Sequence, residues 1–517
     1  MHSVGMVLFL VVLATSVATG ARRWRIPAPS LLVLAGIAVA MVPGAPAMHI
    51  APETIGLVVL PPLLYASAEE LSLRDLRAVW RPVTVLALGL VLASAAAVGA
   101  LAALLTPLPL PLAFVLGAVL ASTDPVAVSA LGRRLALPGR VQVLVQAESL
   151  FNDATSLVLF RVAVTVAVAS SAFSWQGAVG EFALLAGGGS AVGAAVAGVV
   201  HLIRRRTADP VLETVIALVT PYAAYVLAES AHTSGVTAVV VAGVLLGRAG
   251  HRLSDARIRL QLHAVYAVVV FLLESVVFSL VGLELPTMVR ELPADSGWWP
   301  VQALAVAAAL VGLRVLWMLP LSAALRPSGG RPSWRIATVI TWAGTRGVMP
   351  LAAALSIPLA DAHGTPLPGR PLILVLTTAV VVFTLVVQGL SLAPLVNRSG
   401  LALEPEHTAR EEQQAREQLA RAGLEHLDGL AELEATPEHV LDRVRRGLQA
   451  RLRHAEDAEE SDGGAPALAV YRELRREVID VQNTELHRLY DDHRISDTTR
   501  RQLQRDLDLE AAALGAS

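Results

Sequence analysis

One apolar stretch of the chain carries four oxygen-bearing side chains, Glu148, Ser149, Asn152 and Asp153. Residues four apart lie on the same side of an α-helix, which brings all four close together. Hydroxyl, amide and carboxylate oxygens at this spacing can bind a hard monovalent cation. A proton and a cation neutralise the same negative charge, so the two compete for one carboxylate. We therefore expect Asp153 to exchange a monovalent cation for protons.

The elements expected beside this cluster are two apolar helices that are interrupted at their middle. One is broken by Ser122 to Pro125, and the other by Gly344 to Gly347 followed by Pro350. A proline removes a backbone donor, so carbonyl groups at these breaks are expected to lack helical bonds and to be able to coordinate a small cation. Interrupted helices at matching positions of two halves typically mark a transporter's binding site. The alternative is that these residues only kink two membrane helices.

An ionisable residue at the centre of a bilayer costs at least about 2.5 to 3.5 kcal/mol and is expected to be paired or functional. Seven residues in the apolar stretches are candidates. They are Asp124, Glu148, Asp153, Arg161, Glu274, Arg314 and Arg346. If the interrupted helices meet, Arg346 is the natural partner of Glu148, and such an ion pair could equally serve the fold alone. Arg161 is expected near the face of Asp153 or extended towards the membrane interface. The other polar residues are expected to pair within the bundle or lie near an interface: Glu274, Glu284, Arg314 and His232.

The composition is that of an integral membrane protein. Of the 517 residues, 54% are hydrophobic and 16% are charged, and the mean hydropathy is +0.59. Apolar stretches of about 17 to 25 residues are long enough to cross a bilayer as helices. The sequence thus predicts an all-α polytopic transmembrane domain over residues 1–400. Its spans, about thirteen, are expected at 3–20, 27–42, 54–68, 82–105, 110–131, 141–169, 178–203, 211–228, 234–247, 264–285, 300–325, 335–359 and 371–396.

The arginines of this domain are concentrated in alternate loops. The other set of loops holds only Arg290 and Arg370. By the positive-inside rule, the N-terminus is expected outside the cell membrane and the C-terminal tail in the cytoplasm. The first span could instead be a cleaved signal peptide, but its basic residues follow the apolar run. The interrupted spans 5 and 12 lie seven apart and so cross in opposite directions, which predicts two inverted six-helix repeats joined by span 7.

Residues 401–517 have a different character, with 16 Arg and 26 acidic residues after position 400. Their leucines recur among opposite charges at helical spacing. We expect a cytosolic helical domain with a regulatory or dimer-contact role and an unidentified regulator; the alternative is a solvated appendage. No nucleotide, phosphate or calcium motif is present, and no cofactor is expected besides the transported ions. The lack of Cys, HExxH and GxSxG argues against thiolate metal sites and membrane hydrolases.

Four strings occur in order along the chain: ASTDPVAVSALG (121–132), ESLFNDATSLVLF (148–160), FLLESVVFSLVGLEL (271–285) and AGTRGVMPLAAAL (343–355). In this order they resemble the sodium/proton antiporters of the NhaP and NHE type, within the monovalent cation:proton antiporter superfamily. The resemblance covers about the first 400 residues, and its ND pair after ESLF is quite specific. It implies a secondary active transporter that is not an enzyme. It also implies a homodimer in membrane lipid, in which a six-helix core domain moves against a dimerisation domain.

The resemblance also implies roles for the site residues. In that family the carboxylate of the ND pair carries the ion and the proton, which would be Asp153 here. Asn152, Ser149, Thr123 and Asp124 would complete the site, with the monovalent cation at Asp153 and Asp124. An Asn in place of a second Asp is associated with electroneutral, one-for-one exchange.

In the same family the glutamate before the serine pairs with the arginine of the broken helix, here Glu148 with Arg346. Some relatives also have an acidic residue in span 3. The matching string here is LPPLLYASAEE, which leaves the hydroxyl of Ser67 as the candidate ligand. Glu274, Ser67 and Arg161 are thus further candidates for the site. Selectivity among Na+, Li+ and K+ stays open, and the alternatives are a K+/H+ antiporter or a non-transporting membrane sensor of ions or pH.

Overall fold

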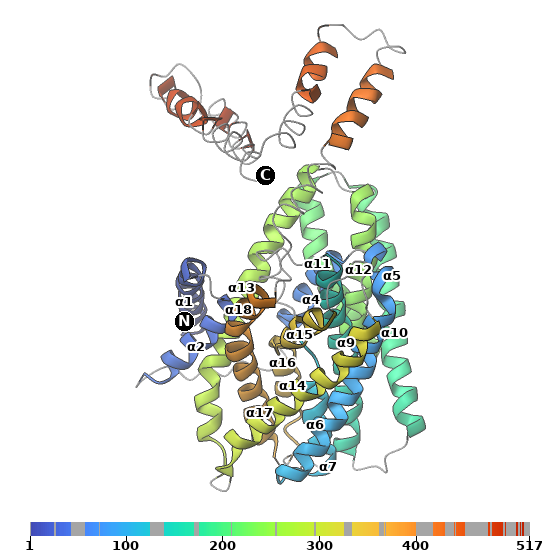
Figure 1. Cartoon of the computed structure of the whole chain (residues 1–517), viewed down its shortest axis with the longest axis vertical. Helices are drawn as coiled ribbons and strands as arrows, with labels where there is room; N and C mark the ends of the chain where they lie inside the picture. Colours follow the sequence, from blue (N-terminus) through green and yellow to red (C-terminus); the bar gives the residue numbers. More distant parts are fainter. Residues whose placement is uncertain are drawn as a thin grey trace. The chain divides into compact units, whose positions relative to one another are not determined.

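The computed structural model of the chain is built of helices (Figure 1). It divides into two compact units, Met1–Leu403 and Glu404–Ser517. In the first unit the structure describes residues 2–24, 27–42, 57–71, 73–124, 139–169, 175–207, 209–253, 256–293, 296–324, 333–360, 365, 367 and 369–399. In the second unit it describes parts of 417–510.

The first unit consists of long apolar helices and several shorter ones. Its first half contains α1 (His2–Trp24), α2 (Ala28–Ala40), α4 (Leu60–Glu69), α5 (Leu73–Thr84), the π-helical segment η1 (Val85–Leu90), α6 (Val91–Leu105), α7 (Leu110–Leu120) and α9 (Gly139–Ala169). Next come α10 (Trp175–Arg204), α11 (Pro210–Ser230), α12 (Gly235–Leu253), α13 (Ala256–Arg290) and α14 (Trp299–Ala324). The last part contains α15 (Ser333–Trp342), α16 (Val348–Leu355), α17 (Arg370–Phe383), the π-helical segment η3 (Thr384–Gln388) and α18 (Gly389–Ser399).

The length and apolar character of these helices confirm a multi-pass membrane protein. Among the described residues, seven helical segments are long and apolar enough to cross a membrane. They are Val79–Leu105, Val143–Val168, Gln176–Arg204, Pro210–Ser230, Ile258–Arg290, Trp299–Met318 and Arg370–Ser399. Shorter apolar helices include Leu8–Ala21 and Ala28–Ala40. Each of the thirteen predicted spans contains a described helix, but the number of spans and their two-repeat arrangement stay predictions.

Small residues allow several of these helices to pack backbone against backbone. A Cβ atom on Gly36 of α2 would collide with the backbone around Ser279 and Gly282 of α13. A Cβ atom on Gly117 of α7 would in the same way meet the backbone of Ala95 in α6. Close approach through small residues is the usual way in which helices associate in a membrane, where no hydrophobic driving force exists between them.

The described residues include the whole of the second predicted helix interruption and the start of the first. The helix α7 ends at Leu120, and the backbone from Ser122 to Asp124 is not helical. Pro125 lies outside the described residues. In the second interruption, α15 ends at Trp342 and α16 begins at Val348. Such irregular backbone is tolerated at membrane depth where it is enclosed by protein or lines a cavity.

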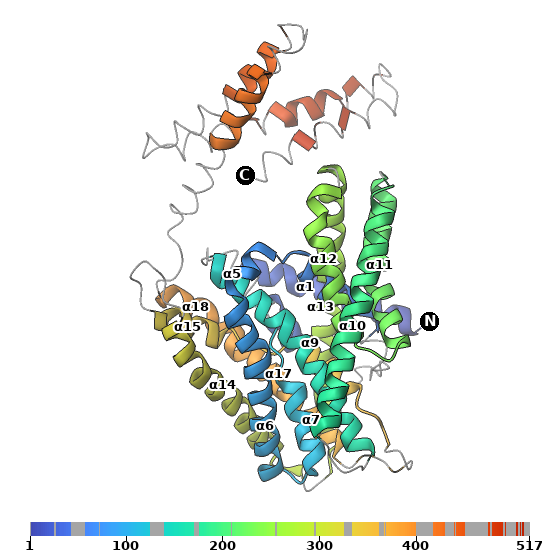
Figure 2. The same ribbon diagram turned by 90° about the vertical axis from the view of Figure 1, so that its right-hand side faces the viewer.

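The helix α9 packs against α7, α5, α10 and η1. Figures 1 and 2 show α14 running obliquely across the bundle beside α6. The η3 segment contacts α2 and continues into α18. π-Helical turns of this kind occur frequently at functional sites because they redirect backbone groups.

The longest described segments of the second unit, 417–429, 441–449 and 478–486, are helical. Exposed ion pairs are present on its surface, for example between Arg445 and Asp428 at 2.7 Å. Its apolar residues Leu427, Ile479 and Leu486 are buried. Its cytosolic location and its regulatory role stay predictions.

Candidate functional site

The side chains of the predicted cluster are buried inside the first unit. Glu148 is 1% exposed, Ser149 and Asn152 are each 2% exposed, and Asp153 is 6% exposed. All four lie on α9, as the helical spacing predicts. Polar groups at this depth need partners, because a buried donor or acceptor without one is costly.

Two of these residues bind the interrupted backbone that follows α7. The Asn152 amide donates to the Thr123 hydroxyl at 2.6 Å, and its Oδ1 accepts from the Thr123 backbone N–H at 3.3 Å. The Ser149 hydroxyl donates to the carbonyl of Thr123. Further along α9, the Ser156 hydroxyl donates to the carbonyl of Ala118 at 2.7 Å. The sequence-predicted residues Ser149, Asn152 and Thr123 are therefore brought together by direct contacts.

The two interrupted segments also bond to each other. The backbone N–H of Asp124 donates to the carbonyl of Thr345 at 2.8 Å, and the Thr345 hydroxyl donates to the carbonyl of Asp124 at 3.0 Å. A Cβ atom on Gly347 would overlap the carboxylate of Asp124. Gly347 precedes α16, so the Asp124 carboxylate lies at the positive N-terminal end of that helix, where a negative charge is favoured. The two interrupted segments thus meet at these residues, which was the condition for the expected pairing of Glu148 with Arg346.

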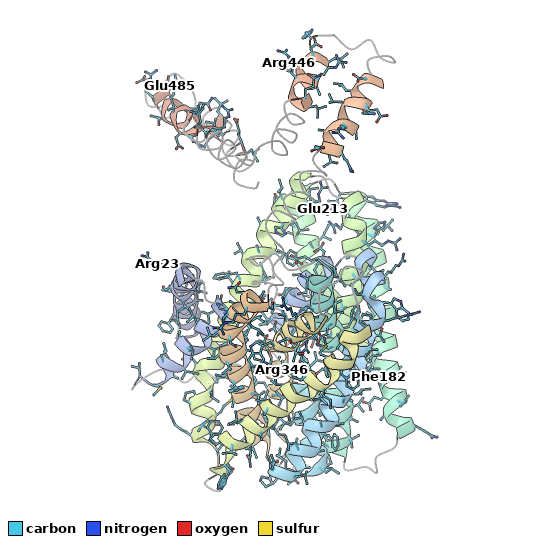
Figure 3. The ribbon with its side chains drawn as sticks, viewed as in Figure 1. Arg23, Phe182, Glu213, Arg346, Arg446 and Glu485 are labelled. Carbon is cyan, nitrogen blue, oxygen red and sulfur yellow. The ribbon has the colours of Figure 1, made fainter. Side chains whose placement is uncertain are left out.

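Arg346 lies in the second interruption, midway along the bundle, whereas Glu213 lies at one end of it (Figure 3). Its Nη1 donates to the carbonyl of Gly344 at 2.5 Å, and its Nε donates to the carbonyl of Leu120 at 3.2 Å. Its backbone N–H donates to the Thr384 hydroxyl in η3 at 3.1 Å. Leu120 ends α7 and Gly344 follows α15. The guanidinium therefore places its charge where two helices end, which is where their dipoles favour a cation.

The prediction that Glu148 pairs with Arg346 is wrong, because its ion-pair partner is Arg314. Arg314 of α14 pairs with Glu148, with Nη1 to Oε1 at 2.6 Å and Nη2 to Oε2 at 2.9 Å. Arg314 also donates from Nε and Nη2 to the carbonyl of Ile340 on α15, both at 3.2 Å. A planar guanidinium can contact both oxygens of a carboxylate at once; here Nη2 donates a hydrogen bond to Oε2, and Nη1 makes a charge contact with Oε1. Arg346 is occupied by the helix ends instead.

The carboxylate of Asp153 is not fully bonded and, unlike that of Glu148, forms no ion pair among the described residues. Its Oδ1 is buried and has no hydrogen-bond partner among the described residues. The polar groups that act most on this carboxyl are Asp124 and the hydroxyl of Ser122. A buried, charged oxygen without a donor is costly, and a second carboxylate nearby adds repulsion. A proton or a small cation bound at Asp153 would relieve both costs.

The three further candidates are not brought to this group by any contact that the described residues show. Ser67 is exposed, and its hydroxyl donates to the carbonyl of Leu63 on its own helix at 3.1 Å. Glu274 is half-buried on α13. Arg161 pairs with Glu229 of α11. The roles of all three residues in ion binding stay predictions.

Sequence reasoning did not identify the cross-link made by Thr345, nor the contact of Thr384 with the Arg346 backbone. It expected Arg314 to pair within the bundle, which is confirmed, without naming its partner. Ser156 could have been found, because it lies three residues after Asp153 and one face of α9 carries the cluster.

Comparison with known proteins gives a consistent picture for the first unit. Residues 7–398 match a family model described as "Sodium/hydrogen exchanger, transmembrane". An uncharacterised Na+/H+ exchanger of Mycobacterium tuberculosis is 33% identical over 98% of this chain and 95% of its own length. The Na+/H+ antiporter ApNhaP of Aphanothece halophytica is 34% identical over 73% of this chain and 70% of its own.

Two further similarities concern ion range and fold. A sodium, potassium, lithium and rubidium/H+ antiporter of Bacillus pumilus is 32% identical over 72% of this chain and 58% of its own. The sodium proton antiporter MjNhaP1 from Methanocaldococcus jannaschii has a solved structure that superposes with a TM-score of 0.64. That match covers 77% of this chain and 99% of the other at 22% identity, which establishes a shared fold.

Proposed function

The chain belongs to the transmembrane sodium/hydrogen exchanger family, and we propose that it exchanges Na+ for H+ across the membrane at Asp153. It is a multi-pass transporter rather than an enzyme. The observation that carries the proposed site is the buried Oδ1 of Asp153, which lacks a hydrogen-bond partner among the described residues. Both transported ions would satisfy this oxygen, and one carboxylate cannot easily hold both.

The remaining ligands of the cation come from groups already beside Asp153. We assign this role to the oxygens of Ser149 and Asn152, which share α9 with Asp153, and to those of Thr123 and Asp124 in the break after α7, where Thr123 bonds to both Ser149 and Asn152. Several of these oxygens already accept or donate hydrogen bonds within the protein. A cation would therefore enter a site whose ligands are held in place before binding, which reduces the entropy lost on binding.

The distribution of charge around the site supports electroneutral, one-for-one exchange. Glu148 is neutralised by Arg314, and Arg346 faces the negative ends of two helices. Asp124 faces the positive end of α16. Asp153 then remains as the charge that the transported ion must balance. One proton or one monovalent cation does this equally well, so each cycle would move one of each.

We further propose that this site is exposed alternately to the two sides of the membrane by a core that moves against a dimerisation domain. Thirteen spans in two inverted repeats, an external N-terminus, a cytoplasmic tail and a homodimer in the cell membrane belong to the same proposal. Two meeting helix interruptions and a fold shared with MjNhaP1 support it.

A broader cation range is the second candidate function. It is favoured by the similarity to the Bacillus pumilus antiporter, whose name includes potassium, lithium and rubidium. Oxygen ligands bind all these ions, and the size of the site decides between them. A K+/H+ antiporter is thus the nearest alternative. A sensor without transport is less well supported, because it would need no meeting of two interrupted helices.

The test uses proteoliposomes that contain a pH-sensitive dye, with Na+, Li+ or K+ added outside. The wild-type protein is expected to move protons in response to Na+, and Asp153→Asn is expected to lose this response. Glu284→Gln is the matched control, because it makes the same kind of change in a half-buried carboxyl of α13 that forms no ion pair among the described residues. Equal exchange by the wild-type and Asp153→Asn proteins would refute the assigned site.

A further inference from the structure

Arg161 and Glu229 form an ion pair that joins the ion-carrying helix to a different part of the bundle. Arg161 lies on α9, eight residues after Asp153, which corresponds to about 12 Å along the helix axis. Its Nη2 bonds to Glu229 near the end of α11, and its Nη1 donates to the carbonyl of Thr233 at 3.4 Å. The position is distinct from the site around Asp153.

The partner of Arg161 is fixed in place by the turn between α11 and α12. The Glu229 carboxylate also accepts from the backbone N–H of Gly235, the first residue of α12, at 3.2 Å. In the same turn, the backbone N–H and the hydroxyl of Thr233 bond to the carbonyl of Ala228 at 2.9 Å and 3.0 Å. Arg161 is therefore bound to a rigid turn by its charge and by a backbone carbonyl.

The pair lies beside the turn that joins α11 to α12 and is partly exposed, in contrast to the pair that α9 forms with α14. The side chains of Arg161 and Glu229 are 35% and 33% exposed, whereas those of Arg314 and Glu148 are 4% and 1% exposed. When a buried pair separates, each charge loses its compensation, whereas a partly exposed pair at a helix end contributes less to stability and separates at lower cost. α9 can thus leave the α11–α12 turn more readily than it can leave α14.

We propose that the Arg161–Glu229 ion pair is a releasable contact that stabilises one of the two access states of the transporter. This proposal rests on the alternating exposure of Asp153 described above. A movement of α9 that opens the Arg161 end of the site must separate Arg161 from the α11–α12 turn. While the ion pair is formed, the site is closed at that end. When the ion pair breaks, the state that is open at that end gains population.

Removing the Arg161–Glu229 ion pair should change the apparent KM for Na+ differently on the two sides of the membrane. A ligand's apparent affinity falls with the fraction of molecules in the competent state, so a shifted equilibrium lowers the apparent KM on one side and raises it on the other. For a partly exposed ion pair we expect the ratio of the two apparent KM values to change about 2- to 5-fold. A purely structural contact would lower stability or maximal rate and leave this ratio unchanged.

The experiment measures the apparent KM for Na+ on each side of sealed vesicles of known orientation. The variants are Glu229→Gln, Arg161→Gln and the double variant, with Arg161→Lys as the conservative replacement. Glu229→Gln keeps an oxygen to accept from Gly235, so the turn should still form. Glu181→Gln is the matched control. Glu181 lies on α10, and its carboxylate accepts a hydrogen bond from the hydroxyl of Thr165, which lies near the same end of α9 as Arg161.

The expected result has three parts. Glu229→Gln and Arg161→Gln change the KM ratio in the same direction, and the double variant changes it no more than either one, because the two side chains act through one contact. Arg161→Lys and Glu181→Gln keep the wild-type ratio. An unchanged ratio in both Gln variants, or additive changes in the double variant, would overturn the proposal. A wild-type protein without Na+/H+ exchange would instead refute the proposed function, so the two failures are distinguishable.

Discussion

Replacing Arg314 by methionine should destabilise the protein strongly without touching Asp153. Removing one partner of a buried ion pair costs about 3 to 5 kcal/mol, because Glu148, 1% exposed, would keep an uncompensated charge. The carbonyl of Ile340 would also lose the two bonds that Arg314 donates at 3.2 Å, which adds about 1 kcal/mol. The expected loss is about 4 to 6 kcal/mol. At roughly 2 °C per kcal/mol, this corresponds to about 10 °C in the unfolding midpoint.

The assay heats detergent-solubilised protein and measures the fraction that remains monodisperse on a size-exclusion column. Arg346→Met serves as the comparison, because both arginines are buried and lie near Glu148. Each variant is then combined with Glu148→Gln, which removes the charge that would be left unpaired. We expect Glu148→Gln to recover a large part of the loss caused by Arg314→Met and little of the loss caused by Arg346→Met.

The pattern of recovery tests the reasoning more sharply than the size of either loss. If Glu148→Gln restored stability to Arg346→Met but not to Arg314→Met, the functional partner of Glu148 would be Arg346. An Arg314→Met protein as stable as the wild type would show that the ion pair and the Ile340 contacts contribute nothing measurable.

Two further predictions concern the site itself. Gly347→Ala should lower the exchange rate in the vesicle assay at least about tenfold, because its Cβ would overlap the Asp124 carboxylate. The control is Gly312→Ala on α14, which has open space around it and should exchange at the wild-type rate. A fully active Gly347→Ala protein would show that Asp124 can move without consequence. The apparent KM for Na+ should rise as pH falls, because protons compete for Asp153, while the rate at saturating Na+ changes less; a KM independent of pH would contradict direct competition.

Much of the fold follows from hydrophobicity and from the position of helix-breaking residues. Every predicted span contains a described helix, because a run of apolar residues must form its backbone hydrogen bonds internally when it crosses a bilayer. The breaks near Asp124 and Gly347 were also predictable, because polar residues and glycines within an apolar helix are costly unless they serve a function. The π-helical segments η1 and η3 had no signal in the sequence, because their geometry depends on tertiary contacts such as that between Ser30 and the carbonyl of Leu385.

The site was predictable where one helix determines it and not where several helices meet. Spacing along α9 was enough to bring Ser149 and Asn152 to one face, and both contact Thr123. The partner of Glu148 depends on which of two arginines approaches it, and this is set by the position of α14. Sequence symmetry favoured the arginine in the broken span. The carbonyls at the ends of α7 and α15 bind that arginine more closely, since such carbonyls have no intrahelical partner.

The two ion pairs of α9 together indicate which helices move with Asp153. Separating the buried pair to α14 would cost several kcal/mol, because each charge would lose its compensation inside the protein. Separating the partly exposed pair to α11 costs less, about 0 to 1 kcal/mol for an exposed ion pair. α9 should therefore stay with α14, and the bonds of Ser156 and Asn152 keep α7 and its following segment with it. The boundary along which the transporter opens is then expected between α9 and the α11–α12 turn, on the side of Asp153 where Arg161 lies.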